Sequence, residues 1–291
     1  MKKKILILGS SGILGKNLVK QLKVKYKVLH NGIKKRKIDL TRLMPLKQIL
    51  KNSKPDLIIN CAAITNLDFC EVNKVQSKRV NVDITNKLFF LKKKNNYNFK
   101  FIQISTDQMY NGKKKLKSSE NCKPVSFNEY TKQKLAVEKI CIRNKAVVIR
   151  LNFFSKEKKN IFNWVIKSCK LNHRINLFKD IHFNPISVSS LSKIIEKIIP
   201  RILKDDIGGI YNLGCKDNIS KSNFCIYVIN KLNLNYKNYK IVSSNKFIKT
   251  RRPKNMSMNV SKFQKKFKIN LPILKNEINN YLKETNVKIQ N

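Results

Sequence analysis

The chain has 291 residues, and 42% of them are hydrophobic. This length and apolar content suit one large α/β domain or two domains, and they exclude a disordered chain. Against 17 acidic residues stand 63 lysines and arginines, a formal net charge of +46. The basic residues are spread along the whole sequence without a nucleic-acid-binding motif, so we interpret them as a solvated surface, with polyanion binding as the alternative.

The sequence also argues against a membrane protein and a metal site. No apolar run approaches the ~18 residues that a membrane-spanning helix needs. The seven cysteines have no paired spacing, and no cluster of cysteine and histidine suggests a metal. Scattered cysteines are typical of reduced thiols, which predicts a cytoplasmic protein. The lack of a long apolar run predicts that it has no membrane partner.

Short apolar runs alternate with segments of helical period through the first half of the chain. The runs predict strands at residues 4–8, 26–29, 56–60, 99–104 and 146–151. The longer segments predict helices at residues 13–22, 43–51, 75–93 and 126–143. This alternation is typical of an α/β protein with a Rossmann-type, doubly wound parallel sheet. We expect that domain to occupy residues 1–151.

After residue 152 the rhythm loosens. Helices are predicted at residues 162–171, 191–203, 223–232 and 273–282, and short strands at 210–213 and 240–242. This pattern predicts a smaller, mixed α/β lobe over residues 152–291, some segments of which return to the first domain.

The first predicted strand runs into a glycine pattern, Gly9-x-x-Gly12-x-x-Gly15, before the first predicted helix. Gly9 is expected to allow a tight turn, Gly12 a close approach of backbone to a pyrophosphate, and Gly15 close packing of helix and strand. The N–H groups at the start of the helix then bind phosphate. The pattern indicates a dinucleotide site, with an ordinary strand–helix turn as the alternative.

The segment after the second predicted strand lacks the acidic residue that usually holds the ribose 2′-OH of NADH. Lys34, Lys35 and Arg36 stand there instead, which favours NADPH over NADH. Asp39, followed by Leu40, is in place for a hydrogen bond to adenine, and a carboxylate that caps a turn is the other interpretation.

Tyr130 and Lys134 are four residues apart in a predicted helix and therefore share a face. A neighbouring ammonium is expected to lower the pKa of a phenol from its ordinary value near 10, which suits proton transfer. Thr106 ends the fourth predicted strand, where open α/β sheets bind ligands, and its hydroxyl suits the same carbonyl oxygen. The alternatives are an exposed tyrosine with a chance lysine, and a turn threonine.

The third predicted strand ends in Asn60-Cys61-Ala62-Ala63. These small residues would let a flat cofactor pass close to the backbone, although simple close packing would also select them.

Together these motifs resemble the extended short-chain dehydrogenase/reductase superfamily and, within it, the dTDP-4-dehydrorhamnose reductases. Further residues match that pattern in order: Asn81, Glu138, Arg150, Asn184, Pro185, Asn212 and Pro253. The resemblance implies reduction by NAD(P)H of the C4 keto group of a nucleotide-activated deoxysugar, dTDP-4-dehydrorhamnose giving dTDP-rhamnose. This reaction belongs to the synthesis of cell-surface polysaccharide precursors. Gln108 and Ile186 depart from the pattern where it shapes the sugar pocket, so the nucleotide base and the sugar stereochemistry stay open.

The resemblance also implies a role for each matching residue. Tyr130 would donate the proton, Lys134 would assist it, and Thr106 would orient the carbonyl. The implied cofactor contacts are Gly9, Gly12, Ile13, Leu14, Gly15, Asp39, Leu40, Ala62, Ala63, Ile64, Tyr130 and Lys134. The implied substrate contacts are Thr106, Asp107, Asn152, Phe153 and Arg252, of which the arginine suits the diphosphate.

Three other functions stay open on the sequence. One is an epimerase or dehydratase of the same superfamily. Another is a non-catalytic, NADP-binding regulatory subunit, which the complete set of Thr106, Tyr130 and Lys134 argues against. The last is a nucleic-acid-binding protein. The oligomeric state is also open, a homodimer being one alternative.

Overall fold

The computed structural model describes residues 1–30, 38–110, 116–158, 160–247 and 249–286. The chain divides into two compact units. The first unit comprises Met1–Thr106, Val125–Arg150 and Ser192–Tyr211, and the second comprises Asp107–Pro124, Leu151–Leu191 and Asn212–Asn291. The chain thus crosses between the units several times. That residues 1–151 bind the cofactor and residues 152–291 mainly the substrate stays a prediction.

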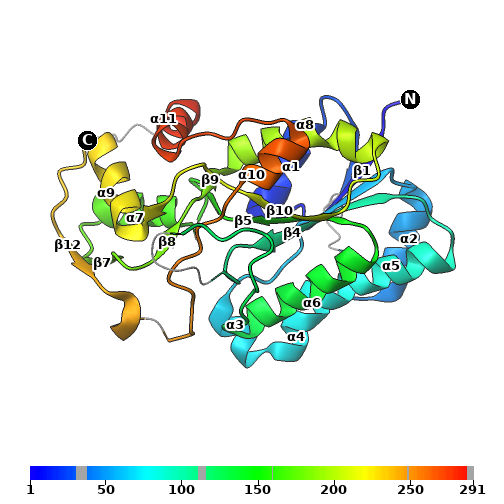
Figure 1. Cartoon of the computed structure of the whole chain (residues 1–291), viewed down its shortest axis with the longest axis horizontal. Helices are drawn as coiled ribbons and strands as arrows, with labels where there is room; N and C mark the ends of the chain where they lie inside the picture. The colour runs from blue at the N-terminus through cyan, green and yellow to red at the C-terminus, as the bar shows by residue number, and fades with distance from the viewer. Residues whose placement is uncertain (31–37, 111–115, 159, 248, 287–291) are drawn as a thin grey trace. The chain divides into compact units, whose positions relative to one another are not determined.

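A six-stranded sheet forms the centre of the first unit, with the strand order β10-β5-β4-β3-β1-β2 (Figure 1). Its strands are β1 (Lys4–Leu8), β2 (Lys27–His30), β3 (Leu57–Asn60), β4 (Lys100–Thr106), β5 (Val147–Leu151) and β10 (Gly209–Leu213). β1 pairs in parallel with β2 and with β3, and β3 pairs in parallel with β4. The continuous apolar runs of these strands are therefore explained by burial on both faces.

Helices cover both faces of this sheet (Figure 1). Their bounds are α1 (Ile13–Leu22), α2 (Leu43–Ser53), α3 (Leu67–Val72), α4 (Lys74–Lys78), η1 (Arg79–Asp83), α5 (Ile84–Lys94), α6 (Glu129–Arg143) and α8 (Val188–Lys204). On one face, Leu6, Leu8 and Ile58 of the sheet share a buried cluster with Leu50 of α2 and Leu88 of α5. α1 lies on the opposite face, together with α8 (Figure 1).

The structure corrects three boundaries expected from the sequence. Residues 210–213 were assigned to the smaller lobe, but β10 joins the main sheet beside β5. The helix expected at residues 75–93 contains a π-helical turn, η1. The helix expected from residue 126 begins at Glu129, because Asn128 has an extended backbone and its side chain caps the helix.

The second unit contains short strands and four α-helices among its described residues. The helices are α7 (Ile161–Lys170), α9 (Lys221–Lys231), α10 (Ser261–Phe267) and α11 (Leu274–Thr285), with a 3-10 turn, η2 (Ser244–Lys246). The strands are β6 (Phe153–Phe154), β7 (Ile175–Phe178), β8 (His182–Phe183), β9 (Ile186–Ser187), β11 (Ile219–Ser220) and β12 (Tyr239–Val242). They pair two by two, as β11 with β8, β12 with β7 and β6 with β9.

An aromatic cluster forms the core of the second unit. The ring of Phe154 lies 5.6 Å from that of Phe162, 5.5 Å from that of Phe224 and 5.3 Å from that of Tyr281, measured between centroids. Such contacts stabilise packing beyond the burial of area alone. In neither unit do the described residues include a helix both long and apolar enough to cross a bilayer.

Candidate functional site

The turn between β1 and α1 has the backbone that its glycines were expected to provide. Gly9 has a φ of +74°, and a Cβ atom on it would lie 2.5 Å from the amide nitrogen of Ala62. A Cβ on Gly15 would lie 2.2 Å from the carbonyl oxygen of Gly9. Both positions therefore exclude a side chain, which keeps the turn, the end of β3 and the start of α1 closely packed.

The start of α1 offers donors to a phosphate. Gly12 is the N-cap and brings no side-chain cap, while its own N–H donates to the carbonyl oxygen of Gly9 at 3.0 Å. In the described part of the chain, the N–H groups of Ile13, Leu14 and Gly15 donate to no acceptor. Unsatisfied N–H groups at the positive end of a helix bind anionic phosphate, so this cradle fits the diphosphate of a dinucleotide.

Asp39 caps a turn, which was the alternative to a contact with adenine. Its carboxylate accepts hydrogen bonds from the Thr41 N–H at 2.9 Å and the Thr41 hydroxyl at 2.6 Å. These bonds, the hydroxyl first, hold the pKa of the exposed Asp39 carboxyl below its ordinary value. A contact of Asp39 with adenine stays a prediction, whereas Leu40 is buried in the core. The basic residues Lys34, Lys35 and Arg36 lie outside the described residues.

Buried amides shape the loop that follows β3. The Asn60 side chain accepts a hydrogen bond from the Ala62 N–H at 3.1 Å. Asn81 holds Ile64 at two points, because it accepts from the Ile64 N–H at 2.8 Å and donates to the Ile64 carbonyl oxygen at 3.1 Å. Asn81 lies on the π-helical turn η1, and such turns are often found at functional sites. The side chains of Asn60 and Asn81 thus fix the loop of Ala62, Ala63 and Ile64.

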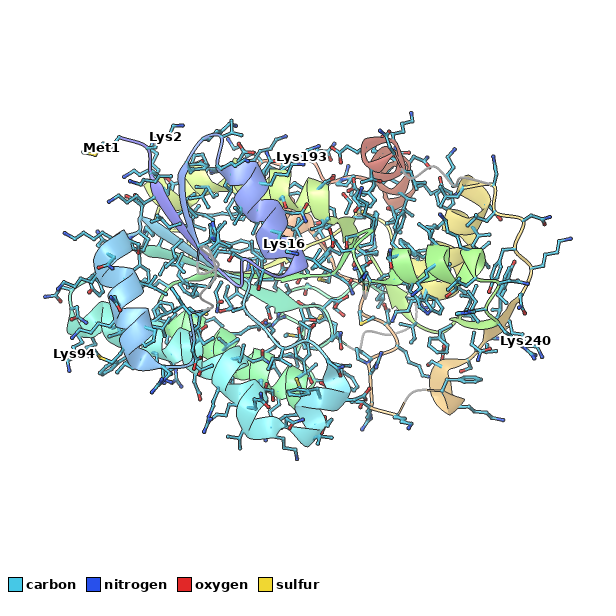
Figure 2. The ribbon with its side chains drawn as sticks, turned by 180° about the vertical axis from the view of Figure 1, so that it is seen from behind. Met1, Lys2, Lys16, Lys94, Lys193 and Lys240 are labelled. Atoms are coloured by element: carbon cyan, nitrogen blue, oxygen red, sulfur yellow. The ribbon has the colours of Figure 1, made fainter. Side chains whose placement is uncertain are left out.

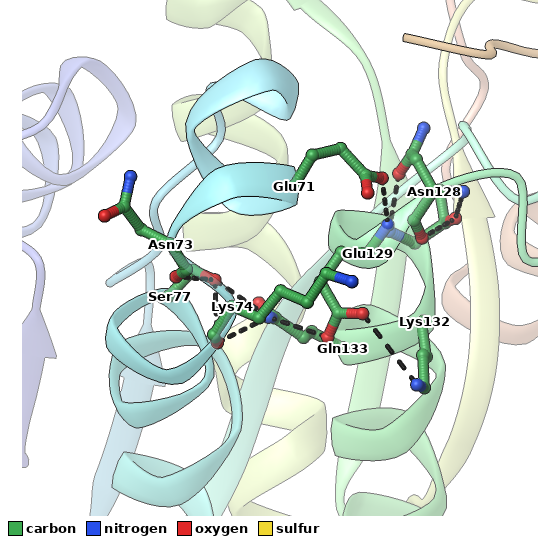
Figure 3. A network of polar contacts seen from close by, with 9 residues as sticks. Glu71, Asn73, Lys74, Ser77, Asn128, Glu129, Lys132 and Gln133 are labelled. Carbon is green, nitrogen blue, oxygen red and sulfur yellow. Dashed lines mark hydrogen bonds and ion pairs between the residues drawn. The ribbon is translucent and has the colours of Figure 1, made fainter.

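The N-terminus of α6 is fixed by its own cap and by the helices beside it. Asn128 and Thr131 form a reciprocal capping box, which places Tyr130 in the first turn of the helix. Figure 3 shows Gln133 of α6 facing α4, where its amide donates to the Ser77 hydroxyl at 2.8 Å. At the start of the helix, the Glu129 N–H donates to a Glu71 carboxylate oxygen at 2.7 Å (Figure 3).

Gln133 also connects this helix with the loop after β3. Its side-chain oxygen accepts a hydrogen bond at 2.8 Å from the same Asn81 amide that binds Ile64. A chain of buried amides therefore joins the expected cofactor loop to the helix that carries Tyr130 and Lys134. Buried networks that satisfy every member favour one geometry.

Tyr130 and Lys134 are both buried, at 5% and 3% exposure. The Lys134 ammonium donates to the carbonyl oxygen of Ile104 at 3.1 Å and lies 5.8 Å from the centroid of the Tyr130 ring. Burial lowers the pKa of Lys134 from 10.5 to about 8, and the carboxylate of Glu138 opposes that shift. The structure thus brings together a phenol and an ammonium whose pKa lies near neutral pH. This arrangement suits transfer of a proton to a developing alkoxide.

A buried ion pair connects α6 with β4 and β5. The Glu138 carboxylate binds the Arg150 guanidinium at 2.6 Å, and each side chain is about 2% exposed. The same carboxylate accepts a hydrogen bond from the Ser105 hydroxyl at 2.6 Å. Thr106, which is 5% exposed, follows directly in β4. The ion pair therefore fixes the helix of Tyr130 against β5, and the Ser105 hydrogen bond fixes it against β4, the strand of Thr106.

The remaining substrate candidates belong to the second unit. Asp107 is 1% exposed, and its carboxylate accepts a hydrogen bond from the Asn152 amide at 2.8 Å. Phe153 is half-buried in β6, and Arg252 is exposed. The structure thus joins Asp107 with Asn152, while their contacts with a sugar stay predictions. No group of three metal-ligating side chains is found among the described residues.

The roles of several residues were not predicted from the sequence. Asn81, Glu138 and Arg150 were matched to the family pattern without a role, and Gln133 was not singled out. One signal was available, because Glu138 follows Lys134 by four residues and an acid there shares its buried face. The amides gave no such signal, since their partners lie on other elements.

Comparisons with known proteins identify related sequences and folds. Residues 2–287 match the family described as RmlD substrate binding domain. A dTDP-4-dehydrorhamnose reductase of Aggregatibacter actinomycetemcomitans is 23% identical over 237 residues, covering 78% of this chain and 79% of that protein.

Two solved structures share the fold over nearly the whole chain. A dTDP-4-dehydrorhamnose reductase from Clostridium acetobutylicum is 22% identical, with a TM-score of 0.88, covering 98% of this chain and 100% of that one. The same enzyme from Bacillus anthracis, in complex with NADP, is 22% identical, with a TM-score of 0.85, covering 98% and 99%. The predicted Rossmann-type α/β fold and the resemblance to this family are confirmed.

Proposed function

Because the chain belongs to the RmlD substrate binding domain family, we propose that it reduces the C4 keto group of dTDP-4-dehydrorhamnose to give dTDP-rhamnose. One observation carries the proposal: Lys134 is buried, held by the Ile104 carbonyl and placed beside the ring of Tyr130. Burying an ammonium costs free energy, strongly perturbed buried groups are typical of functional sites, and the position of this one beside a phenol suits proton transfer.

The cofactor of the proposed reaction is NADPH. The glycine turn and the N–H groups of Ile13, Leu14 and Gly15 fit its diphosphate. Bound NADPH supplies the hydride that reduces the ketone. The choice of NADPH over NADH is supported by the basic residues 34–36 and by the NADP found in the Bacillus anthracis structure. A reaction that consumes NADPH and a nucleotide sugar belongs in the cytoplasm, where we place this protein.

The chain itself would manage the proton and the orientation of the substrate. The Tyr130 hydroxyl donates its proton to the oxygen of the former ketone. The positive charge of Lys134 stabilises the phenolate that remains, and the Thr106 hydroxyl orients the carbonyl. Asp107, Asn152 and Phe153 contact the sugar in this proposal, and Arg252 contacts the diphosphate.

The decisive experiment follows NADPH oxidation and sugar products with dTDP-4-dehydrorhamnose as substrate. A net reductase consumes one NADPH for each product molecule. Tyr130→Phe removes the proton donor but keeps the ring, so we expect the rate to fall roughly 10²–10⁴-fold while the Kd for NADPH is unchanged. Tyr97→Phe is the matched control, because Tyr97 is a half-buried tyrosine outside the site, and it should keep the wild-type rate.

Other results would favour the alternatives. Conversion of a nucleotide sugar without net NADPH consumption would indicate an epimerase or dehydratase. NADPH binding without turnover of any dTDP-, UDP-, GDP- or CDP-linked 4-keto sugar would indicate a regulatory subunit. A rate for Tyr130→Phe within a few-fold of the wild type would refute the assigned proton donor.

A further inference from the structure

Lys221 lies at the start of α9 in the second unit. It is the first residue of α9, and its backbone N–H donates to the carbonyl oxygen of Ile181 at 2.8 Å. The side chain is half-buried, and within the described residues its ammonium has neither a hydrogen-bond acceptor nor an ion pair. Partial desolvation without a hydrogen bond is unfavourable for the charged form of this side chain.

A second cation, Arg252, lies near Lys221. Arg252 is exposed, and the described residues give its guanidinium no hydrogen bond or ion pair. The backbone brings the two together: Ser220 of β11 pairs with His182 of β8, and His182 also forms a bridge with Asn255. Burial lowers the pKa of Lys221, and the nearby charge of Arg252 lowers it further.

The carboxylates around this pair are engaged elsewhere. Asp180 forms an ion pair with Lys254 at 3.0 Å and accepts hydrogen bonds from Ser243 and Ser244. Asp107 accepts from the Asn152 amide, and its charge raises the pKa of Lys221 without an ion pair between them. The charge of Arg252 therefore disfavours the charged form of Lys221, the Asp107 carboxylate favours it, and an added anion would relieve the repulsion between the two cations.

We propose that Lys221 and Arg252 form a two-point anion site that binds the diphosphate of the nucleotide sugar. The inference rests on the proposed function and extends it to a residue outside the motifs that the sequence singled out. An ammonium with three donors and a planar guanidinium fork suit two linked phosphates. Asp107, whose charge acts on Lys221, accepts a hydrogen bond from Asn152, so sugar hydroxyls attached to that diphosphate would meet hydrogen-bonding groups.

The test measures the Kd of dTDP and of NADPH for the full chain by titration calorimetry. Lys221→Met removes the charge and nearly keeps the length, and it should weaken dTDP binding roughly 10- to 100-fold, the range for one charge-assisted hydrogen bond. Lys221→Arg should stay within a few-fold of the wild type. Lys231→Met, which changes an exposed lysine in the last turn of the same helix, should leave the Kd unchanged.

NADPH separates a lost site from a lost fold. Unchanged NADPH affinity in Lys221→Met, together with weakened dTDP binding, supports the site. Equal dTDP affinity in Lys221→Met and wild type overturns it, and so does a loss of NADPH binding in this variant, which would indicate a structural role or a cofactor phosphate as the ligand.

The proposed function can fail separately. Wild-type protein that binds dTDP through Lys221 but does not reduce the 4-keto sugar refutes the reductase and keeps the anion site. Wild-type protein that reduces the sugar while Lys221→Met binds dTDP normally refutes the anion site and keeps the reductase. Absence of any dTDP binding to the wild type overturns both.

Discussion

Lys134 shows how one buried side chain couples the chemistry of the site to its stability. Burial brings its pKa down to about 8 from the ordinary 10.5, so the charged form is disfavoured in the folded chain. Catalysis in the proposed mechanism uses that charged form. The residue is therefore placed against the preference of its surroundings, which is typical of functional groups.

The pH dependence of kcat/KM tests this placement. As the pH rises through about 8, Lys134 of the free enzyme loses its proton, and kcat/KM should fall. In Lys134→Arg the guanidinium stays charged, so whatever activity this variant keeps should extend to higher pH. A wild-type profile that stays flat between about pH 7 and 9.5 would contradict the assignment.

Stability should change in the opposite direction over the same window. Between pH 8 and 10.5 the unfolded chain holds the Lys134 proton more tightly than the folded chain. The contribution of this residue to the free energy of unfolding therefore rises as the pH increases through that window. Urea titrations at each pH thus separate a catalytic loss from unfolding.

At the scale of elements, the catalytic helix α6 is held from two sides. Its N-terminal turn is bonded to α3 and α4 through Glu129 and Gln133. Its buried middle is bonded to β4 and β5 through Glu138. Tyr130 and Lys134 lie between these two attachments, so their position relative to the end of β4 depends on both.

Removing one member of the Glu138–Arg150 pair tests the second attachment. Glu138→Leu leaves the Arg150 charge buried without its partner, and we expect the free energy of unfolding to fall by about 3–5 kcal/mol. The double variant Glu138→Leu with Arg150→Met removes both charges and should recover most of that loss, as measured by urea unfolding. Equal destabilisation of the single and double variants would show that the pair is not the cause.

At the scale of the whole molecule, the dominant feature is positive charge. Lys94, Lys193 and Lys240 belong to different elements, and all three are exposed at separate places in Figure 2. Among the described residues, some cations form exposed ion pairs, such as Lys100 with Asp206 at 3.2 Å. Exposed pairs of this kind contribute little to stability, so the charge acts mainly on association with anions.

Salt dependence measures that association. A sugar nucleotide carries about two phosphate charges, so kcat/KM should fall moderately as salt rises from about 0.05 to about 0.5 M and screens the attraction. Binding to two unrelated DNA duplexes should be equal and largely lost near about 0.15 M salt, because it rests on counterion release. Tight binding to one duplex and not the other would promote the nucleic-acid alternative.

Local features of the sequence determined the first unit well. The glycine turn, the strand–helix alternation and the spacing of Tyr130 and Lys134 depend on residues close in the chain, and periodicity and backbone freedom express them directly. The structure agrees on β1 and α1 residue for residue, and Gly9 has the positive φ that a tight turn requires.

Other features were decided only by tertiary structure, because they pair groups that are far apart in the sequence. The strand β10 reads alone like any short apolar run, and only the open edge of β5 assigns it to the main sheet. The buried amide of Asn81 holds Ile64 by a hydrogen bond. Lys221 comes near Arg252 because His182 pairs with Ser220 and also forms a bridge with Asn255. The roles of such residues depend on burial and on charges from other elements, and the spacing of residues along the chain predicts neither.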